Sequence, residues 1–188
     1  DVVTNALARS TMRIMGPKYM TAGLGDAGAC HPRDNIALRY MADNLDLGYD
    51  LFDAIMNARE IQAKNLAEVL AAESHRTGMP VYIHGKAYKP DVPYCDGSYS
   101  LLIGHYLENT FGITPIYIDP LTGDTVDHAI KGVILLAHNK TVTYKYRGFE
   151  DQQGFYCSIE PGSIVIDPWR TLPRITTPFK VIHYGNTR

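Results

Sequence analysis

The segment HRTGMP, residues 75–80, separates two kinds of hydrophobic pattern in this chain. Before it, apolar residues recur at intervals of three and four, which is the period of an amphipathic helix. After it, short runs of β-branched and aromatic residues alternate with a helical segment. Strands that alternate with helices indicate a mainly parallel sheet with helices on its faces. We therefore expect an α/β chain in which a helical segment precedes that sheet.

The helical part covers residues 1 to about 77. Its start, DVVTNALARSTMRIM, is typical of an amphipathic helix. A longer helix is expected from about Gly48 to His75, where Gly78 and Pro80 end it. The apolar positions that indicate helices beyond the start are Ile36, Leu38, Tyr40 and Met41 in one segment, and Leu51, Ile55, Ile61, Leu66, Val69 and Leu70 in the next.

Beyond Pro80, five short apolar runs predict strands: VYIHGKAY, TPIYIDP, GVILLAH, SIVIDPW and FKVIHYG. The segment SLLIGHYLENTFG lies between the first two runs and predicts a helix that Gly112 closes. The stretch from Asn139 to Glu160 is polar and aromatic without a firm period, so its sequence indicates neither helix nor strand.

Composition narrows the class of function. The 188 residues carry a formal net charge of -2, so a broad basic face for nucleic acid is not indicated. No apolar run approaches the roughly 20 residues needed to cross a bilayer, and no signal peptide is evident. Cys30, Cys95 and Cys157 are widely spaced, which indicates free thiols rather than disulfides or a zinc site. We expect a soluble, cytoplasmic protein without a metal site and, because the first residue is Asp1 rather than Met, a piece of a longer chain.

The segment GLGDAGACHPRD, residues 23–34, admits two interpretations. Its Gly23-x-Gly25-x-x-Gly28 spacing matches a dinucleotide-binding fingerprint, but no hydrophobic strand precedes it and Pro32 stands where a helix should begin. The favoured interpretation is a glycine-rich loop whose backbone comes close to a ligand.

In that interpretation, the loop presents Cys30 just before a helix that starts near Asp34 or Asn35. A thiol near a helix N-terminus and beside Arg33 has an enlarged thiolate fraction. Asp34 lies close enough to act as a base toward water that attacks an intermediate on the sulfur. The residues alone leave open that Cys30 is a buried structural thiol and Asp34 only a helix cap.

At these residues the chain resembles the nucleotide-sugar dehydrogenases that oxidise UDP-glucose, GDP-mannose and their relatives to uronic acids. The family's nucleophile loop reads approximately GPGFGGSCFPKD, and GLGDAGACHPRD shares its spaced glycines, cysteine, proline and final aspartate. The family's third domain opens with a strand followed by GLAFKPDT, to which HGKAYKPDV is similar. The ending FKVIHYGNTR is similar to the family's closing strand.

The resemblance implies a parent protein with an NAD-binding Rossmann domain, a helical linker domain that forms the dimer, and a Rossmann-like domain that binds the nucleotide sugar. Residues 1–77 would be the end of the linker domain, residues 78–188 the C-terminal Rossmann-like domain, and the NAD-binding domain would be absent. The helix from about Gly48 to His75 would then pair across the two-fold axis of a homodimer; the alternative is an ordinary core helix.

The resemblance also implies an NAD-dependent double oxidation of a UDP-hexose through an aldehyde and a thioester. Cys30 would form the thiohemiacetal and the thioester, and Asp34 would help water to hydrolyse it. Arg33 would keep the positive charge that the family's lysine carries. NAD would be bound mainly by the missing domain, so the chain alone would not oxidise its substrate.

Further residues are implied to bind the nucleotide sugar. Lys89 and its neighbour Tyr88 match the segment that contacts the nucleotide, where a lysine near a diphosphate is physically reasonable. The other candidates are Gly25 and Gly28 by close backbone approach, Tyr19 as an aromatic residue near the base, Arg13 as an arginine that reaches across the dimer, and Arg170 on the substrate side, with a surface arginine as its alternative.

Two departures from the family pattern keep other functions open. Asp96 stands where the family carries an arginine on the NAD side, and Asp26 replaces an aromatic residue of the glycine loop. Both departures favour a non-catalytic nucleotide-sugar-binding or dimer-forming module. An unrelated cysteine hydrolase that pairs Cys30 with His31 or a distant histidine is disfavoured, because no helix is expected to begin at Cys30 and Pro32 intervenes.

Overall fold

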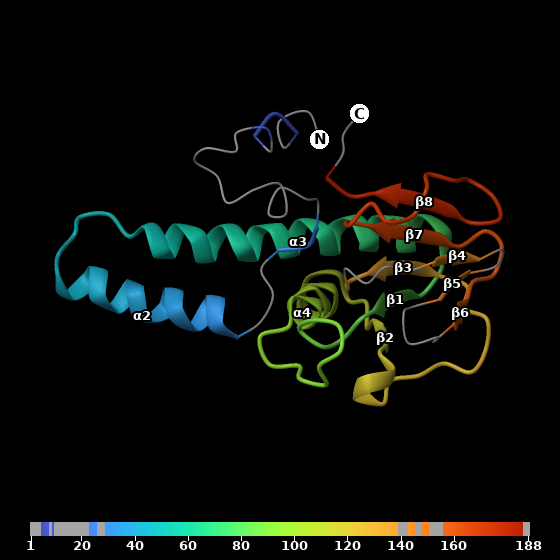
Figure 1. Cartoon of the computed structure of the whole chain (residues 1–188), viewed down its shortest axis with the longest axis horizontal. Helices are drawn as coiled ribbons and strands as arrows, with labels where there is room; N and C mark the ends of the chain where they lie inside the picture. Colours follow the sequence, from blue (N-terminus) through green and yellow to red (C-terminus); the bar gives the residue numbers. More distant parts are fainter. Residues whose placement is uncertain are drawn as a thin grey trace.

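The computed structural model describes residues 5–7, 9, 23–25, 29–138, 143–145, 148–150 and 156–185. Two helices, α2 (Cys30–Asn44) and α3 (Leu51–Thr77), lie side by side and extend from an α/β body (Figure 1). Residues 5–7 of the helix expected at the start are helical, and most of that segment lies outside the described residues. The elements of the body are β1 (Val81–His84), α4 (Tyr99–Phe111), β2 (Ile116–Ile118), the 3-10 helix η2 (Pro120–Thr122), β3 (Val133–Leu136), β7 (Ile164–Asp167) and β8 (Lys180–His183).

The long helix α3 is the expected one, with slightly different ends. The Asp50 carboxylate accepts hydrogen bonds from two backbone N–H groups of the first turn, both at 3.0 Å, so the helix begins at Leu51 rather than near Gly48. It ends at Thr77, where Gly78 takes the left-handed conformation with a φ of 69°. The predicted helix stop at Gly78 is confirmed.

The five predicted strands form one sheet in the order β2-β1-β3-β7-β8, and every neighbouring pair is parallel. This confirms the α/β fold with a parallel sheet. The chain runs from β1 through α4 to β2 on one side, and then crosses to β3 on the other side of β1. The carboxyl ends of β1 and β3 therefore flank a topological switch point, where open α/β sheets bind their ligands.

Helices cover one face of the sheet in the described part of the chain, which corrects the expectation of helices on both faces. The second half of α3 packs there together with α4, and this layer includes Leu66, Leu70, Ile103 and Leu107, all fully or almost fully buried. The opposite face packs against loops and a smaller sheet. The physical reason is in the crossovers, because the described connections that lead to β3 and β7 contain no α-helix to lay on that face.

The stretch without a firm period contains three short strands, β4 (Thr143–Lys145), β5 (Gly148–Glu150) and β6 (Tyr156–Ser158). They pair in antiparallel order β4-β5-β6 as the smaller sheet. Strands of three residues are too short to display the alternation by which a strand is recognised in a sequence. Cys157 of β6 is buried in the core on this side of the main sheet.

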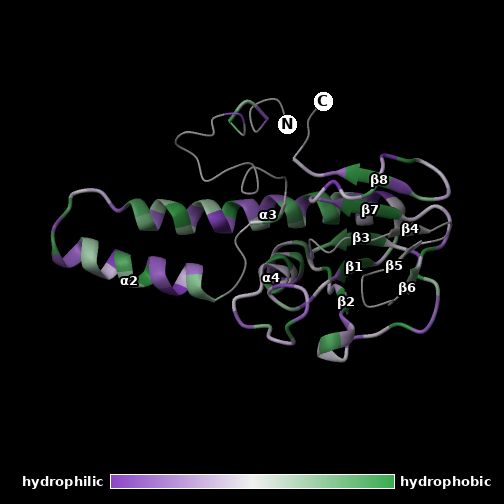
Figure 2. Cartoon of the chain, in the orientation of Figure 1, coloured by the Kyte–Doolittle hydropathy of each residue, from purple (hydrophilic) through white to green (hydrophobic). Residues whose placement is uncertain are grey.

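The helix α2 leaves its apolar residues largely uncovered. Its buried residues are Asn35 and Ala42, whereas the four apolar residues that indicated the helix are 38% to 71% exposed: Ile36, Leu38, Tyr40 and Met41. Figure 2 shows hydrophobic and hydrophilic residues side by side along this helix, in contrast to the inner strand β3, whose four residues are all hydrophobic. None of the described helices is both long and apolar enough to traverse a bilayer.

Candidate functional site

A cavity of about 310 Å³, here called the strand-end cavity, lies at the carboxyl ends of β1, β3 and β7. It occupies the switch point between β1 and β3. None of the described residues that line it is acidic, and most are aromatic or apolar. The lining residues are Leu24, Gly25, Ala87, Tyr88, Lys89, Pro90, Tyr99, Ser100, Ala137, His138 and Trp169. Such a lining suits a ligand that combines a planar ring with negative charge.

Two buried polar side chains hold the backbone of the loop after β1. The Asp119 carboxylate accepts hydrogen bonds from the backbone N–H groups of Lys86 and Ala87, both at 2.9 Å. The Ser98 hydroxyl donates to the Lys86 carbonyl at 2.6 Å. Because both anchors are buried, the loop that lines the cavity is held in one conformation.

The cation of the cavity is Lys89, whose side chain is exposed. Its ammonium group lies 5.2 Å from the centre of the Tyr88 ring, a cation–π contact. The first two residues of α4, Tyr99 and Ser100, also line the cavity, and the described side chains give this helix no N-terminal cap. A lysine beside uncapped N–H groups at a helix N-terminus is a favourable place for a phosphate.

Two glycines of the glycine-rich loop bring its backbone against aromatic rings of the cavity. A Cβ atom on Gly23 would collide with the Trp169 ring, and one on Gly25 would lie 2.6 Å from the Tyr99 ring. Both positions therefore require glycine for close approach. The loop backbone thus comes close to the aromatic rings of Trp169 and Tyr99, whereas the sequence led us to expect close approach to a ligand. Gly25 also lines the cavity.

The loop after β7 is organised by Asp167, the last residue of that strand. Its carboxylate accepts from the backbone N–H groups of Trp169 and Arg170, both at 2.9 Å. The Trp169 indole N–H donates to the Leu136 carbonyl at 3.1 Å, which ties the ring to the end of β3. Arg170 has a left-handed φ of 59° and is not among the described residues that line the cavity, so its assignment to the substrate stays a prediction.

The helix α2 begins at Cys30, which corrects the expected start near Asp34 or Asn35. Pro32 is its third residue, and the N–H groups of a first turn lack partners within the helix, so proline is tolerated there. The start at Cys30 also removes one of the two objections to a cysteine hydrolase. Cys30 is exposed, and Asp34 lies one turn further along the same face of the helix.

Arg33 completes this group, here called the Cys30 cluster. Its guanidinium lies 2.8 Å from the Asp34 carboxylate, and both side chains are more than half exposed. The hydrogen bond to Asp34 raises the pKa of Arg33, to which the charge of Asp34 and then Cys30 add. The structure thus brings Cys30, Arg33 and Asp34 together, but they do not line the strand-end cavity.

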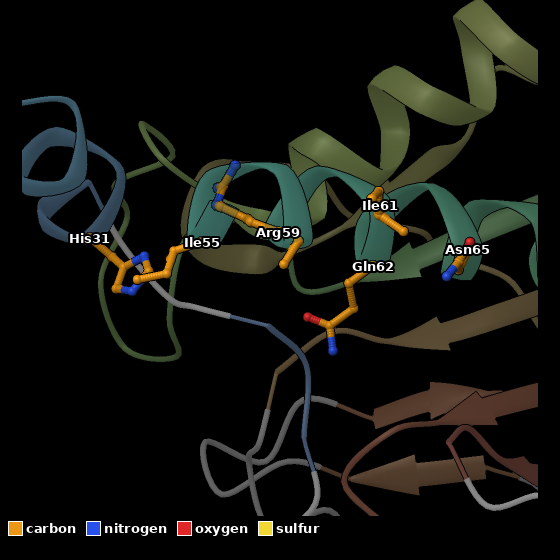
Figure 3. Close-up of a pocket in the computed structure, with 7 residues that line it drawn as sticks. His31, Ile55, Arg59, Ile61, Gln62 and Asn65 are labelled. Atoms are coloured by element: carbon orange, nitrogen blue, oxygen red, sulfur yellow. The ribbon is translucent and has the colours of Figure 1, made fainter. Parts of the chain in front are cut away.

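A second hollow of about 630 Å³, here called the helix hollow, lies between the start of α2 and the first half of α3. Figure 3 shows His31 beside Ile55, with Arg59 and Gln62 further along α3. The Tyr99 hydroxyl lies 3.3 Å from the Arg59 carbonyl and 3.3 Å from the Gln62 side-chain oxygen. Tyr99, whose ring lines the strand-end cavity, therefore connects the two hollows.

The described residues contain no cluster of three or more His, Cys, Asp or Glu side chains arranged to hold a metal ion. Asp96, the departure from the family pattern, is exposed and accepts a hydrogen bond from the Tyr94 hydroxyl at 2.9 Å. It is not among the described residues that line the strand-end cavity.

Comparisons with known proteins point to one family. No protein-family model matches the chain. The GDP-mannose 6-dehydrogenase of Pseudomonas putida is 38% identical over 58 residues, 31% of this chain and 13% of that protein. The UDP-glucose 6-dehydrogenase TuaD of Bacillus subtilis is 28% identical over 78 residues, 41% of this chain and 17% of that protein. A solved UDP-glucose dehydrogenase of Pyrobaculum islandicum superimposes with a TM-score of 0.57 at 20% identity, covering 90% of this chain and 40% of that one.

The chain is related to the UDP-glucose/GDP-mannose dehydrogenase family. It spans about 40% of the length of the solved relative, and its sequence matches cover less than a fifth of the two curated ones. The structural likeness concerns the fold, which in this chain is the helical hairpin followed by the five-stranded parallel sheet.

The two segments that resemble family motifs both contribute to the strand-end cavity. The YKPD segment contributes Tyr88 and Lys89, and the glycine-rich loop contributes Gly25. Its Cys30 continues into α2. Four residues singled out in the sequence, Arg13, Tyr19, Gly28 and Asp26, lie outside the described residues.

The family motifs do not predict three prominent residues of the cavity, Tyr99, His138 and Trp169. Their signal in the sequence is positional. His138 and Trp169 are the last residues of two predicted strand runs and stand two residues after the observed strands β3 and β7, and the carboxyl ends of parallel strands meet at one edge of a sheet.

Proposed function

We propose that this chain is the C-terminal part of an NAD-dependent nucleotide-sugar dehydrogenase that oxidises a UDP-hexose to the uronic acid. Residues 1–77 belong to the central helical domain, and residues 78–188 form the nucleotide-sugar-binding domain. The relation to UDP-glucose and GDP-mannose dehydrogenases supports the reaction class. The whole reaction belongs to the parent protein, and the 188-residue chain alone is expected to be inactive.

The observation that carries the proposal is the strand-end cavity. It combines aromatic walls for a base with Lys89 and the uncapped start of α4 for a diphosphate. It also lies at the switch point, where the fold class binds nucleotides. Tyr88 and Gly25 contribute to its wall, as proposed for substrate binding.

The Cys30 cluster supports the chemical part of the proposal. The sulfur would add to the aldehyde carbon, so that a C–S bond forms and the aldehyde oxygen takes up a proton, giving a thiohemiacetal. Oxidation of that carbon gives a thioester, which water cleaves to acid and free thiol. Asp34, on the same helix face, would take the proton of the attacking water, while Arg33 holds the Asp34 carboxylate in position.

NAD does not fit the described part of this chain. None of the described strands is followed by a Gly-x-Gly-x-x-Gly turn into a helix. We therefore assign NAD to a part of the parent protein outside these residues, where it would accept the hydrides.

A homodimer through the helical hairpin is part of the proposal. The exposed apolar residues of α2 continue onto the first half of α3, where Leu51 and Ile61 are 53% and 60% exposed. Exposed apolar area of this kind is typical of an interaction surface. Sedimentation equilibrium of the chain, with Leu51→Glu as the variant, tests it: dimer for the native chain and monomer for the variant is expected.

Calorimetric titration tests the nucleotide-sugar site. UDP-glucose, GDP-mannose and UDP-N-acetylmannosamine are titrated into the native chain and into Lys89→Ala. UDP-glucose is expected to bind best, and Lys89→Ala to weaken it about tenfold or more, because a hydrogen bond to a charged group contributes about 1.5–3 kcal/mol. The matched control is Lys131→Ala, since Lys131 is an exposed lysine at the opposite end of β3. Equal effects of the two lysine variants would contradict the proposal.

The second candidate is a non-catalytic nucleotide-sugar-binding module. It is favoured by the position of the Cys30 cluster, which does not line the strand-end cavity. Activity of the full-length parent with Cys30→Ser separates the two. Complete loss of uronic acid formation supports catalysis, and unchanged nucleotide-sugar binding without any activity in the native parent supports the module.

A further inference from the structure

The glycine-rich loop contacts the α/β body shortly before it reaches Cys30. The Leu24 side chain packs against the hydrophobic core under the helices, and Leu24 and Gly25 line the strand-end cavity. Five residues after Gly25 the chain enters α2, whose first residue is Cys30. The same loop therefore contributes to the wall of the cavity and leads directly to the thiol.

Trp169 is a residue of the body that this loop contacts closely. A Cβ atom on Gly23 would collide with the Cζ3 atom of the Trp169 ring and would lie 2.8 Å from Cε3 and 3.2 Å from Cη2. The loop backbone thus lies against the six-membered part of the indole. Gly23 is not among the described glycines with a positive φ, so it is the Trp169 ring, rather than the backbone conformation, that excludes a side chain at this position.

Trp169 itself is held in place by the ends of two neighbouring strands. Its indole N–H donates to the Leu136 carbonyl at the end of β3, at 3.1 Å, and its backbone N–H donates to the Asp167 carboxylate at the end of β7, at 2.9 Å. The ring also packs against the core on the other face of the sheet. With these contacts, Trp169 is a rigid support for the loop.

A second ring contacts the loop two residues further on. A Cβ atom on Gly25 would lie 2.6 Å from both Cε2 and Cζ of Tyr99. Tyr99 is only 4% exposed and belongs to the core, so its replacement would disturb the core as well as the loop. Trp169 is only partly buried, and its contact with Gly23 can be altered from either side.

We propose that Trp169 is a positioning residue for the thiol chemistry: it holds the glycine-rich loop against the body and so fixes where Cys30 lies relative to the bound nucleotide sugar. The inference rests on the proposed function and adds what aligns the sulfur with a substrate bound through Lys89. Five residues of chain span at most about 18 Å, so a loop held at Gly25 limits where the sulfur can lie. A misplacement of reacting groups by about 1 Å can lower a rate about hundredfold.

The test is a double-mutant cycle of Gly23→Ala and Trp169→Ala in the full-length parent protein. Oxidation of UDP-glucose gives kcat, which is expressed per UDP-binding site counted by calorimetry. Gly23→Ala places a methyl group against the Trp169 ring and changes no residue that lines the cavity. It should lower kcat about ten- to hundredfold and leave the dissociation constant of UDP within about threefold of the native value. In the Trp169→Ala protein, where the ring is absent, the same Gly23→Ala change should alter kcat less than about twofold.

The matched control is Phe111→Ala. Phe111 is another partly buried aromatic residue that packs against the core, but it lies at the opposite end of α4 from Tyr99. Its replacement should lower stability and leave kcat per UDP-binding site at the native value. A residue with only a structural role changes the number of folded sites, whereas a positioning residue changes kcat at each site.

A measurement on the native chain covers the case in which Trp169→Ala fails to fold: the α-protons of Gly23 should show nuclear Overhauser effects to the ring protons of Trp169. Absence of these effects overturns the inference. It is also overturned, with the proposed function left standing, if Gly23→Ala lowers kcat equally with and without the Trp169 ring, or if it lowers kcat no more than Phe111→Ala does. A native parent that forms no uronic acid from UDP-glucose overturns both the proposed function and the inference.

Discussion

The Asp167 carboxylate at the end of β7 is fully buried and accepts hydrogen bonds from the residues that follow it, up to Leu172. One oxygen accepts from the backbone N–H groups of Trp169 and Arg170, both at 2.9 Å. The other accepts from the Leu172 N–H at 2.8 Å and the Thr171 hydroxyl at 3.3 Å. Replacing Asp167 by asparagine turns one of these oxygens into an NH₂ group, which faces donors and cannot accept.

The expected loss of stability follows from these contacts. Asp167→Asn removes two hydrogen bonds to a charged acceptor and leaves their donors without that acceptor. Hydrogen bonds to charged groups contribute about 1.5–3 kcal/mol each, so the free energy of unfolding should fall by about 3–6 kcal/mol. A typical domain has only about 5–15 kcal/mol in total. The variant should therefore be marginally stable or unfolded at 37 °C.

Urea unfolding followed by Trp169 fluorescence measures this directly, because the only tryptophan of the chain lies in the loop that Asp167 holds. The matched control is Asp127→Asn, whose carboxylate is fully exposed and pairs with His128. Surface pairs of this kind contribute about 0–1 kcal/mol. A free energy of unfolding for Asp167→Asn that differs from that of the control by less than about 1 kcal/mol would refute the reasoning.

Three further predictions concern backbone, thiols and pH. Gly85→Ala should lose about 1–3 kcal/mol of stability and weaken UDP, because its φ is 106° and its Cβ would lie 2.6 Å from the His138 ring; calorimetry of unfolding and of binding checks both. In the native chain at pH 8, maleimide should label the exposed Cys30 and spare Cys157, whose pKa burial raises to about 12; mass spectrometry that finds equal labelling would contradict this. Burial also raises the pKa of Tyr117 to about 12, above its usual value near 10, so the folded state keeps the proton and stability should fall as the pH rises from 10 to 12, by up to about 1.4 kcal/mol per unit. Tyr117→Phe should reduce the fall of stability with pH in this range, as measured by thermal unfolding. The same fall in the variant and in the native chain would contradict this explanation.

Local signals in the sequence predict much of this fold. Gly78 and Gly112 end their helices in the left-handed conformation, and the five apolar runs all become strands of one parallel sheet. The predicted start of α2 near Asp34 or Asn35 is wrong, because Pro32 falls in the first turn of the helix, where a proline breaks no hydrogen bond. The exposure of the apolar residues of α2 could not be predicted either. The spacing of apolar residues indicates a helix, but it does not say whether another part of this chain buries them.

The candidate site could be predicted only where a motif lies in one continuous segment. Tyr88 and Lys89 were found through the KPD segment, and Cys30 through the glycine-rich loop. His138 and Trp169 come from strand ends that are more than thirty residues apart, and only the order of the parallel strands brings them together. The spacing of residues in the sequence does not reveal the order of the strands in the sheet, so these residues can be assigned to the cavity only once the topology is known.

The helix α3 has a mechanical consequence for any motion of this protein. Its 27 residues span about 40 Å, with the helix hollow at its first half and the core of the sheet at its second. No glycine or proline interrupts it, so it offers no hinge. We therefore expect α3 to move as a rigid element. Because its second half packs against the sheet, a displacement of α2 would be transmitted through α3 to the strands. A partner protein bound to the helical hairpin would thereby move the Cys30 cluster and the sheet together.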